Sequence, residues 1–380
     1  MIPLSEPVLQ GRELEYVTDC LRSGWISSNG EYIARFEQAL ADYVGVEHAV
    51  ACNCGTSALH VSLILAGVRA DDEVIVPAVT FIAPVNAVRY AGAFPVFVDC
   101  DEYCGIDVDG TRRFLAEECA EIGGVTVNSK TGRRVAAIIP VHVFGTAADM
   151  DPILALARDH GLAVVEDASE ALGSRYKGRM CGALAPLSCL SFNGNKIVTS
   201  GGGGAVLTDD DSLAEGARSL TTQAKEAGIE YLHHRVGYNY RMNNVLAALG
   251  LAQMETIDER LVVKRRNFAL YEQALAAAGA GRLFGQPASS DANRWFYAYI
   301  CADAEAKTEL LRASIAADIQ ARPLWYPNHL QRPYVNMQAY GIERAPWFYD
   351  RLVNLPCSVT LTQYEISKVA AVIGETLTKD

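Results

Sequence analysis

The amino-acid sequence predicts an α/β protein in which a large domain with a mostly parallel, seven-stranded sheet is followed by a smaller C-terminal α+β domain. Apolar runs such as Val135–Val141 and Leu162–Glu166 show no alternation with polar residues, which is typical of strands buried on both faces of a sheet. Helical patterns separate several of these runs, and this alternation favours right-handed crossovers between parallel strands. From about Asn243 the pattern changes to long amphipathic stretches, which indicates a second domain.

The elements follow in order along the chain. The expected strands are His48–Cys52, Glu73–Val76, Pro95–Asp99, Val135–Val141, Leu162–Glu166, Ser188–Phe192 and Ala205–Thr208. The expected helices between them are Thr56–Leu65, Ala83–Tyr90, Thr111–Ala120 and Met150–His160. Beyond them we expect one long helix over 245–278, a strand within 295–302, a helix near Ala306–Ala316 and a final helix that begins near Thr362 with a Thr-Gln-Tyr-Glu capping box. The expected domains are 1–250 and 251–380.

Composition excludes several classes of function. Half of the residues are hydrophobic and 21% are charged, which is the balance of a folded globular protein. No apolar run is long enough for a membrane span, and the first residues lack the pattern of a signal peptide, so we expect a cytoplasmic protein. The net charge of −12 disfavours nucleic acid as a partner.

The ten cysteines include no CxxC pair and no cysteine–histidine cluster with zinc-ligand spacing. We therefore expect thiols in a reducing compartment, with neither disulfides nor a metal site.

Three groups of polar residues follow the ends of predicted strands, where ligands of parallel sheets bind. Gly55-Thr56-Ser57 opens a helix and is either an anion site or ordinary helix capping. Asp167 follows the 162–166 strand and is suited to a metal, to a cation or to a cap. Lys196 lies in the segment Ser191–Gly204, before four glycines that lead into a strand; a P-loop lysine follows its glycines, so that interpretation is rejected.

Together the three groups fit one ligand: an anion at Gly55–Ser57 and Ser191, a cationic ring nitrogen at Asp167, and a carbonyl carbon at Lys196. Pyridoxal 5'-phosphate (PLP) has all three features. Its pyridine nitrogen needs a carboxylate partner, and its aldehyde needs an amine that loses its proton easily.

Three segments carry a family resemblance: Val164–Gly173 (VVEDASEALG), Ser191–Gly204 (SFNGNKIVTSGGGG) and Gly237–Met242 (GYNYRM). The chain resembles the DegT/DnrJ/EryC1/StrS sugar aminotransferases over nearly its full length, from the start through Pro356. The resemblance implies the fold type I aminotransferase architecture with PLP as cofactor.

The resemblance also implies roles for individual residues. Lys196 is expected to be the Schiff-base lysine and the proton carrier, Asp167 to pair with the ring nitrogen, and Phe81 to lie against the ring face, although spacing alone fits a plain core aromatic equally well. Asn239 is expected to reach the phosphate of a neighbouring subunit, which implies a homodimer with shared active sites. The full set of expected cofactor-binding residues is Gly55, Thr56, Ser57, Phe81, Asp167, Glu170, Ser191, Asn193, Lys196 and Asn239.

Glu170 stands where many members have Gln or His, and it resembles the branch that acts at C4 of 4-keto-6-deoxy sugars. The run Gly123–Arg134 and the sequence Arg322-Pro323-Leu324-Trp325 resemble the members that use UDP-N-acetyl sugars more than those that use GDP sugars. Arg241, Arg322 and His329 are candidate contacts for the nucleotide diphosphate, with Arg332 a weaker one; each is also suited to a surface or domain-bridging role.

The expected reaction is therefore a ping-pong transamination from L-glutamate to C4 of a nucleotide-linked 4-keto-6-deoxy-hexose, with UDP-2-acetamido-2,6-dideoxy-4-keto-glucose as first choice, for surface glycan or nonulosonic acid synthesis. The alternative is an enzyme like GDP-perosamine synthase. A PLP-dependent sugar dehydratase of the family would carry histidine in place of Lys196. A nicotinamide-dependent enzyme would need a glycine-rich turn that Cys52–Leu59 lacks. A non-catalytic binding protein on the same fold is disfavoured by intact Asp167, Ser191 and Lys196.

Overall fold

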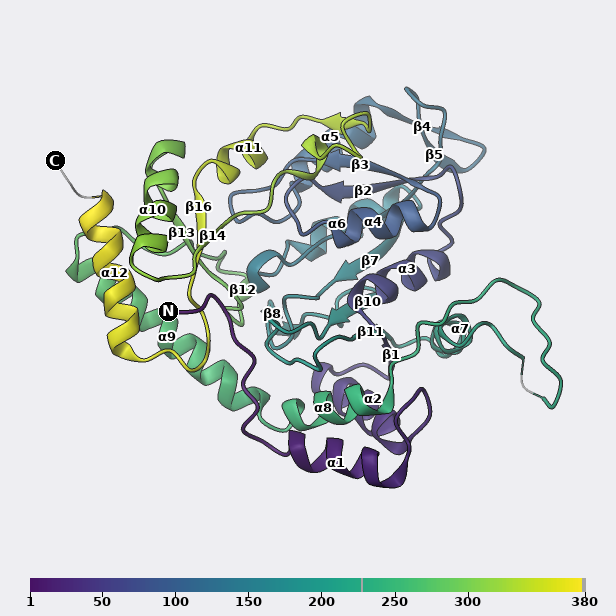
Figure 1. The fold of residues 1–380 in the computed structure, drawn as a ribbon. Coiled ribbons are helices and arrows are strands. Elements are labelled where there is room, and N and C mark those ends of the chain that lie inside the picture. The colour runs from purple at the N-terminus through teal and green to yellow at the C-terminus, as the bar shows by residue number, and fades with distance from the viewer. Residues whose placement is uncertain (227, 378–380) are drawn as a thin grey trace.

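An eight-stranded sheet forms the centre of the computed structural model, which describes residues 1–226 and 228–377 (Figure 1). Its strand order is β1-β11-β10-β7-β6-β2-β3-β15. β11 is antiparallel to its neighbours β1 and β10, and every other neighbouring pair is parallel. The strands are β1 (His48–Cys52), β2 (Glu73–Pro77), β3 (Phe94–Val98), β6 (Val135–Ile138), β7 (Ala163–Asp167), β10 (Leu187–Ser191), β11 (Gly204–Thr208) and β15 (Ala339–Tyr340).

All seven predicted strands are present, but the sheet contains an eighth strand, so the predicted number of strands is too low by one. The additional strand, β15, contains only two residues and pairs with β3 from the C-terminal part of the chain. Two residues are too few to show a periodic pattern, so the sequence could not reveal it. The predicted strand over Val135–Val141 is shorter than expected, because it ends at Ile138 before Pro140, which has no N–H to donate.

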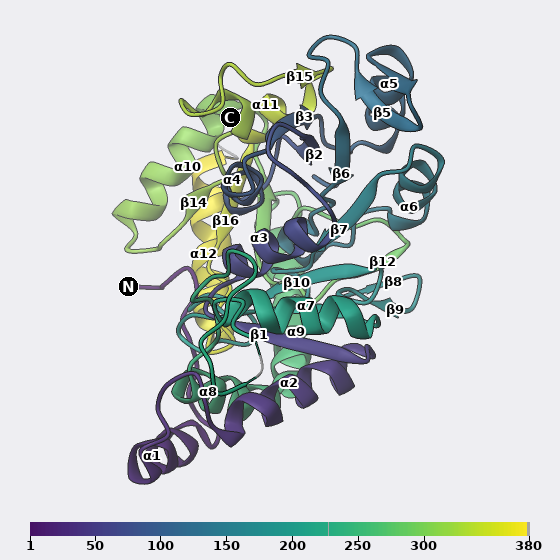
Figure 2. The ribbon, with the colours of Figure 1, turned by 90° about the vertical axis from the view of Figure 1, so that its right-hand side faces the viewer.

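Helices cover both faces of the sheet because alternate strand residues point to opposite sides. In β2, Val74 and Val76 pack into one core cluster with helices α3, α4 and α7, whereas Ile75 packs into the other cluster with α1, α2, α5, α6 and α8. Figure 2 shows α3 and α4 on one side of the strands and α5 and α6 on the other. These helices are α1 (Glu13–Ser23), α2 (Glu31–Val44), α3 (Gly55–Leu65), α4 (Ala83–Tyr90), α5 (Val108–Glu117), α6 (Met150–Asp159), α7 (Asp211–Thr221) and α8 (Asn244–Met254).

The C-terminal part contains a second, antiparallel sheet in the order β13-β16-β14, with helices packed against it. Its elements are α9 (Ile257–Ala277), β13 (Tyr297–Ile300), α10 (Ala304–Ala316), β14 (Arg322–Pro323), α11 (Arg344–Tyr349), β16 (Leu352–Leu355) and α12 (Gln363–Leu377). The remaining short elements are β4 (Cys119–Ile122), β5 (Val125–Asn128), β8 (Arg175–Tyr176), β9 (Arg179–Met180), β12 (Ser290–Asp291) and the 3-10 turns η1 (Val143–Gly145) and η2 (Asn328–Leu330).

The single long helix expected over 245–278 is wrong: α8 ends at Met254 and α9 begins at Ile257. Thr256 between them has φ −120° and ψ 13°, outside the helical region. The two helices have different partners, since α8 packs on α1 and α2 while α9 packs on α12. The capping box of α12 is confirmed, because Thr362 N donates to Glu365 Oε2 at 2.9 Å and Glu365 N donates to Thr362 Oγ1 at 3.2 Å.

The first six residues lie against the C-terminal part. Ile2 bridges to Ile319, Cys357 N donates to the Leu4 carbonyl at 2.7 Å, and Glu6 N donates to Ser358 Oγ at 2.9 Å. Across the described residues, no helix combines the length and the apolar character that crossing a membrane would require.

Candidate active site

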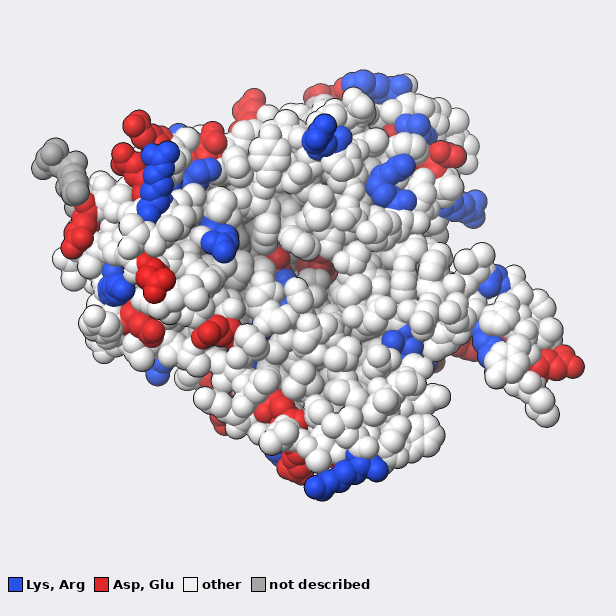
Figure 3. Space-filling model, in the orientation of Figure 1, with Lys and Arg blue, Asp and Glu red and all other residues white. Residues whose placement is uncertain are grey.

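A cavity of about 340 Å³ lies beside the carboxyl ends of β7 and β10 and the start of α3. The face of the molecule drawn in Figure 3 is hollowed near its middle, and atoms of both charge signs are visible in the hollow. Of the expected cofactor-binding residues, eight line the cavity: Gly55, Thr56, Phe81, Asp167, Glu170, Ser191, Asn193 and Lys196.

The start of α3 provides an anion cradle. Cys54 is the N-cap and its sulfur accepts the N–H of Ser57. The Ser57 hydroxyl lies 3.2 Å from the same sulfur, and this buried side chain does not line the cavity. Among the described residues, no group accepts a hydrogen bond from the N–H of Gly55 or Thr56, and these donors lie at the positive end of the helix dipole. A Cβ on Gly55 would come within 2.8 Å of the Ser191 side chain, so glycine lets β10 bring this hydroxyl beside the helix start.

The glycine run after Lys196 allows a close approach of two backbones. A Cβ on Gly204 would lie 2.5 Å from the Gly55 nitrogen, and a Cβ on Gly203 would lie 2.4 Å from the Met242 side chain. The run therefore packs the loop that carries Lys196 directly against the anion cradle.

Asp167 ends β7 and is 4% exposed. Its Oδ1 accepts the N–H of Ser169 at 3.0 Å. Burial raises the pKa of the Asp167 carboxyl, while the Ser169 hydrogen bonds and the positive charge of Lys196 oppose that shift. A cationic ligand atom beside Asp167 would therefore stabilise its ionised form.

A buried network behind Asp167 holds the end of β7. Glu166 accepts hydrogen bonds from His142 Nε2 at 2.8 Å and from Ser188 Oγ at 2.7 Å. His142 Nδ1 accepts the N–H of Ala148 at 3.1 Å, so the imidazole is neutral with its proton on Nε2. Cys181 lies beside these two residues, and the atoms of His142, Glu166 and Cys181 that could bind a metal ion all lie within 4.8 Å of one another. Because internal hydrogen bonds occupy both imidazole nitrogens, we interpret the group as a structural network.

Lys196 follows the turn that leaves β10, where its N–H donates to the Asn193 carbonyl at 3.0 Å. Its Nζ is 3.6 Å from Glu170 Oε1 and 3.8 Å from the ring centroid of Trp295. Burial lowers the pKa of the Lys196 amine, and the charges of Glu170 and Asp167 act in the opposite direction. A lower pKa increases the fraction of free amine that can attack a carbonyl carbon.

Glu170 is 5% exposed, and its Oε2 accepts the N–H of Phe144 at 2.9 Å. Burial raises the pKa of this carboxyl to about 7, against the attraction of Lys196. Glu170 is therefore suited to exchanging a proton with its surroundings near neutral pH.

The remaining predicted residues lie outside this cavity. Asn239 is exposed, and its carbonyl accepts from Asn53 Nδ2 at 3.3 Å. Arg322 is exposed on β14, where its guanidinium donates to the Ala321 carbonyl. His329 lies on η2 beside the Phe97 ring.

His329 and the weaker candidate, Arg332, differ in their exposure. The Nδ1 of His329 is buried without a partner in the part of the chain that the structure describes. Arg332 is exposed.

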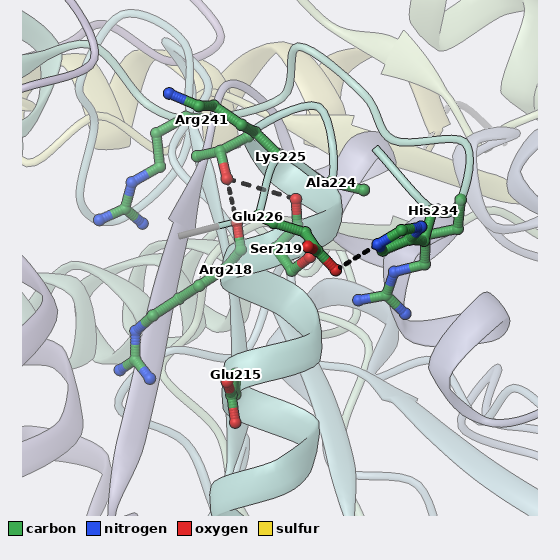
Figure 4. A pocket seen from close by; sticks show the side chains of 10 residues that line it. Glu215, Arg218, Ser219, Ala224, Lys225, Glu226, His234 and Arg241 are labelled. Atoms are coloured by element: carbon green, nitrogen blue, oxygen red, sulfur yellow. Dashed lines mark hydrogen bonds and ion pairs between the residues drawn. The ribbon is translucent and has the colours of Figure 1, made fainter. Parts of the chain in front are cut away.

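Arg241 lines a second, basic cavity of about 840 Å³ at the end of α7 (Figure 4). Its guanidinium forms an ion pair with Glu37. In Figure 4 the side chains of Arg218 and Arg241 extend to the same side, and His234 contacts Glu226. Between α7 and α8, the described residues on both sides of position 227 extend away from the body of the molecule in Figure 1.

Sequence reasoning missed several residues of the Lys196 cavity. Trp295, Phe296 and Trp325 line it from the C-terminal part, and Asn195 lines it beside Lys196 with a buried Oδ1 that has no partner among the described residues. Trp325 carried one signal, since it lies in a loop rich in proline and aromatic residues. The other aromatics lie in a run that indicated only a strand.

The residues present fit PLP. The free N–H groups of Gly55 and Thr56 with the Ser191 hydroxyl suit its phosphate, Asp167 suits its ring nitrogen, and Lys196 suits its aldehyde. When bound, PLP supplies an electron sink for the carbon that exchanges its amino group. Fold and site together define a PLP-dependent aminotransferase.

The chain belongs to the DegT/DnrJ/EryC1/StrS aminotransferase family, whose model matches residues 7–374. It is 39% identical to a GDP-perosamine synthase of Caulobacter vibrioides, covering 99% of this chain and 98% of that protein. It is 35% identical to a GDP-perosamine synthase of Escherichia coli O157:H7, covering 98% of each. A crystal structure of a family aminotransferase from Brucella abortus, 29% identical over 97% of this chain and 96% of that one, superimposes with a TM-score of 0.88. The predictions of family, fold class, cofactor and enzyme class are confirmed.

Proposed function

We propose that the protein transfers an amino group from L-glutamate to C4 of a GDP-linked 4-keto-6-deoxy-hexose. The observation that carries the proposal is the convergence of Lys196, Glu170 and Asp167 in one cavity next to the anion cradle. Lys196 is the amine that moves a proton at the reacting carbon, and Asp167 holds the charge of the ring nitrogen. Glu170, 3.6 Å from the lysine, sets the charge around it.

The choice of nucleotide rests on the relatives. Two proteins that match almost the whole chain at 39% and 35% identity are named GDP-perosamine synthases. These relatives favour the alternative expectation, an enzyme like GDP-perosamine synthase, over the first choice of a UDP-N-acetyl sugar. The expectation of a UDP-linked sugar rested on two segments. Gly123–Arg134 belongs to a surface hairpin and its adjoining loop, and Arg322–Trp325 forms a short strand and its loop.

A homodimer with shared active sites is part of the proposal. Asn239 is exposed outside the cavity of its own chain, so it would have to reach a phosphate in a second copy. Asn239 bridges to Thr222, which lines the basic cavity. Arg218, Lys225, Arg235 and Arg241 outnumber Glu215 and Glu226 in that lining, so it offers net positive charge for a nucleotide diphosphate. We retain the division into domains 1–250 and 251–380 and the cytoplasmic location as proposals.

The test is incubation of the purified, PLP-loaded protein with L-glutamate and a panel of 4-keto-6-deoxy-hexoses linked to GDP, UDP or dTDP, with product masses read by mass spectrometry. We expect amination of the GDP-linked sugar and no product from Lys196→Ala. Borohydride should attach the cofactor to Lys196 in the wild-type protein only. Amination of the UDP-N-acetyl sugar alone would restore the first expectation, and no amination of any sugar would overturn the proposal.

A further inference from the structure

The C-terminal part contributes only aromatic side chains to the Lys196 cavity. Its three lining residues are Trp295, Phe296 and Trp325, which we call the aromatic roof. All polar residues that line the cavity lie between Cys54 and Gly203 in the sequence, in the part of the chain that forms the large sheet. The cavity therefore has a polar floor, which the cofactor's functional groups fit, and an apolar cover.

Packing fixes the roof in one arrangement. The Trp295 ring stacks on Phe296 at 3.9 Å and 10°, and its Nε1 donates to the Asn195 carbonyl at 2.7 Å. Trp325 lies nearly parallel to Trp295, at 6.4 Å and 20°, and it stacks on Phe144 at 5.6 Å and 27°. Rings held by several neighbours lose little further freedom when a ligand binds.

Only part of this aromatic surface is open to a ligand. Trp295 and Phe296 are 3% and 8% exposed, whereas Trp325 is partly exposed and Phe81, with its ring centroid 6.4 Å from that of Trp325, is 53% exposed. A substrate that enters above the polar floor would therefore meet Trp325 and Phe81 first.

We propose that Trp325 is the specificity-determining surface for the C5–C6 end of the hexose and selects a 6-methyl over a 6-hydroxymethyl group. This inference rests on the proposed function. The faces of aromatic rings are electron-rich and attract C–H groups, so they suit the apolar face and the methyl group of a deoxy sugar. A phenyl ring offers no conventional hydrogen-bond partner and an indole offers only its N–H donor, so a hydroxyl group held against the ring faces would exchange its bonds to water for one bond at most.

The experiment compares two ligands on the PLP-loaded enzyme: a GDP-linked 4-amino-4,6-dideoxyhexose and the same sugar with a hydroxyl at C6. Dissociation constants are measured by calorimetry for the wild type, Trp325→Leu and Trp347→Leu. Trp347 is a matched control, because it is 45% exposed on α11 and does not line the cavity. We expect the wild type and Trp347→Leu to bind the deoxy sugar roughly tenfold more tightly than the hydroxylated one, and Trp325→Leu to lower that ratio to about threefold or less.

Two results would overturn the inference alone: equal binding of both sugars by the wild type, or an unchanged ratio in Trp325→Leu. If the wild type binds neither sugar and aminates no keto-sugar, the proposed function fails as well, and the two failures are thereby distinguished. Trp325→Phe keeps an aromatic face and should keep the ratio even if Trp325→Leu loses PLP or unfolds. In the wild type the deoxy sugar should quench tryptophan fluorescence, and Trp325→Phe should remove most of that change.

Discussion

Glu170 is a buried carboxyl whose pKa burial raises from 4.5 to about 7. Because the folded-state pKa is the higher one, the contribution of this group to stability is fully present below pH 4.5 and is lost as the pH rises to about 7. We expect the free energy of unfolding of the PLP-free protein to fall by about 3 kcal/mol more in the wild type than in Glu170→Gln over this range. Urea denaturation at about pH 5 and about pH 8 measures this difference, and parallel pH dependences would show that folding does not raise the pKa of Glu170.

A different prediction concerns Asp167, because the role of this residue depends on its charge. Asp167→Asn keeps the size and the Ser169 contact but removes the charged partner of the ring nitrogen. Hydrogen bonds to charged groups contribute about 1.5–3 kcal/mol, so we expect PLP to bind roughly 10- to 100-fold more weakly. Absorbance titration of PLP into the stripped protein measures this affinity, and equal affinity would remove Asp167 from this role.

Sequence reasoning found the residues that follow strand ends and missed those that meet across the cavity. Asp167 and Lys196 could be predicted because the carboxyl ends of parallel strands share one edge of the sheet. Trp295 and Trp325 could not be placed there, since their position depends on how a loop before β13 and a loop after β14 pack on each other.

At the scale of elements, strands were the most predictable parts. β2 and β7 are buried along nearly all of their length, so their composition alone identifies them. The break between α8 and α9 left no proline or glycine signal; it follows from tertiary packing, in which the two helices cover different parts of the molecule.

The close packing of β11 on the start of α3 gives a prediction with an internal control. A Cβ at Gly204 would lie 2.5 Å from backbone atoms of Cys54 and Gly55, whereas a Cβ at Gly202 has its nearest neighbour, the Asn53 carbonyl, at 4.0 Å. We expect Gly204→Ala to cost roughly 1–3 kcal/mol in the urea unfolding of the PLP-free protein, and Gly202→Ala to change it by less than about 0.5 kcal/mol. Equal effects of the two substitutions would mean that the helix start moves away from β11 without cost.

At the scale of the whole molecule, a shared active site predicts complementation between defective subunits. Lys196→Ala removes the amine of one site, and Asn239→Ala removes a group that we propose to act in the partner's site. Random mixing after dissociation and reassembly gives heterodimers with one intact composite site, so we expect recovery of roughly a quarter of wild-type activity. Mixtures that stay as inactive as the separate variants would show that each chain contains a complete site.

The first six residues join positions very distant in the chain. The hydrogen bond from Leu4 N reaches a residue 316 positions away, and that from Glu6 N reaches one 352 positions away. During synthesis on the ribosome, these N-terminal residues emerge long before their partners exist. The first six residues can therefore pack against these partners only after nearly all of the chain has been translated, which makes this packing a late event in folding.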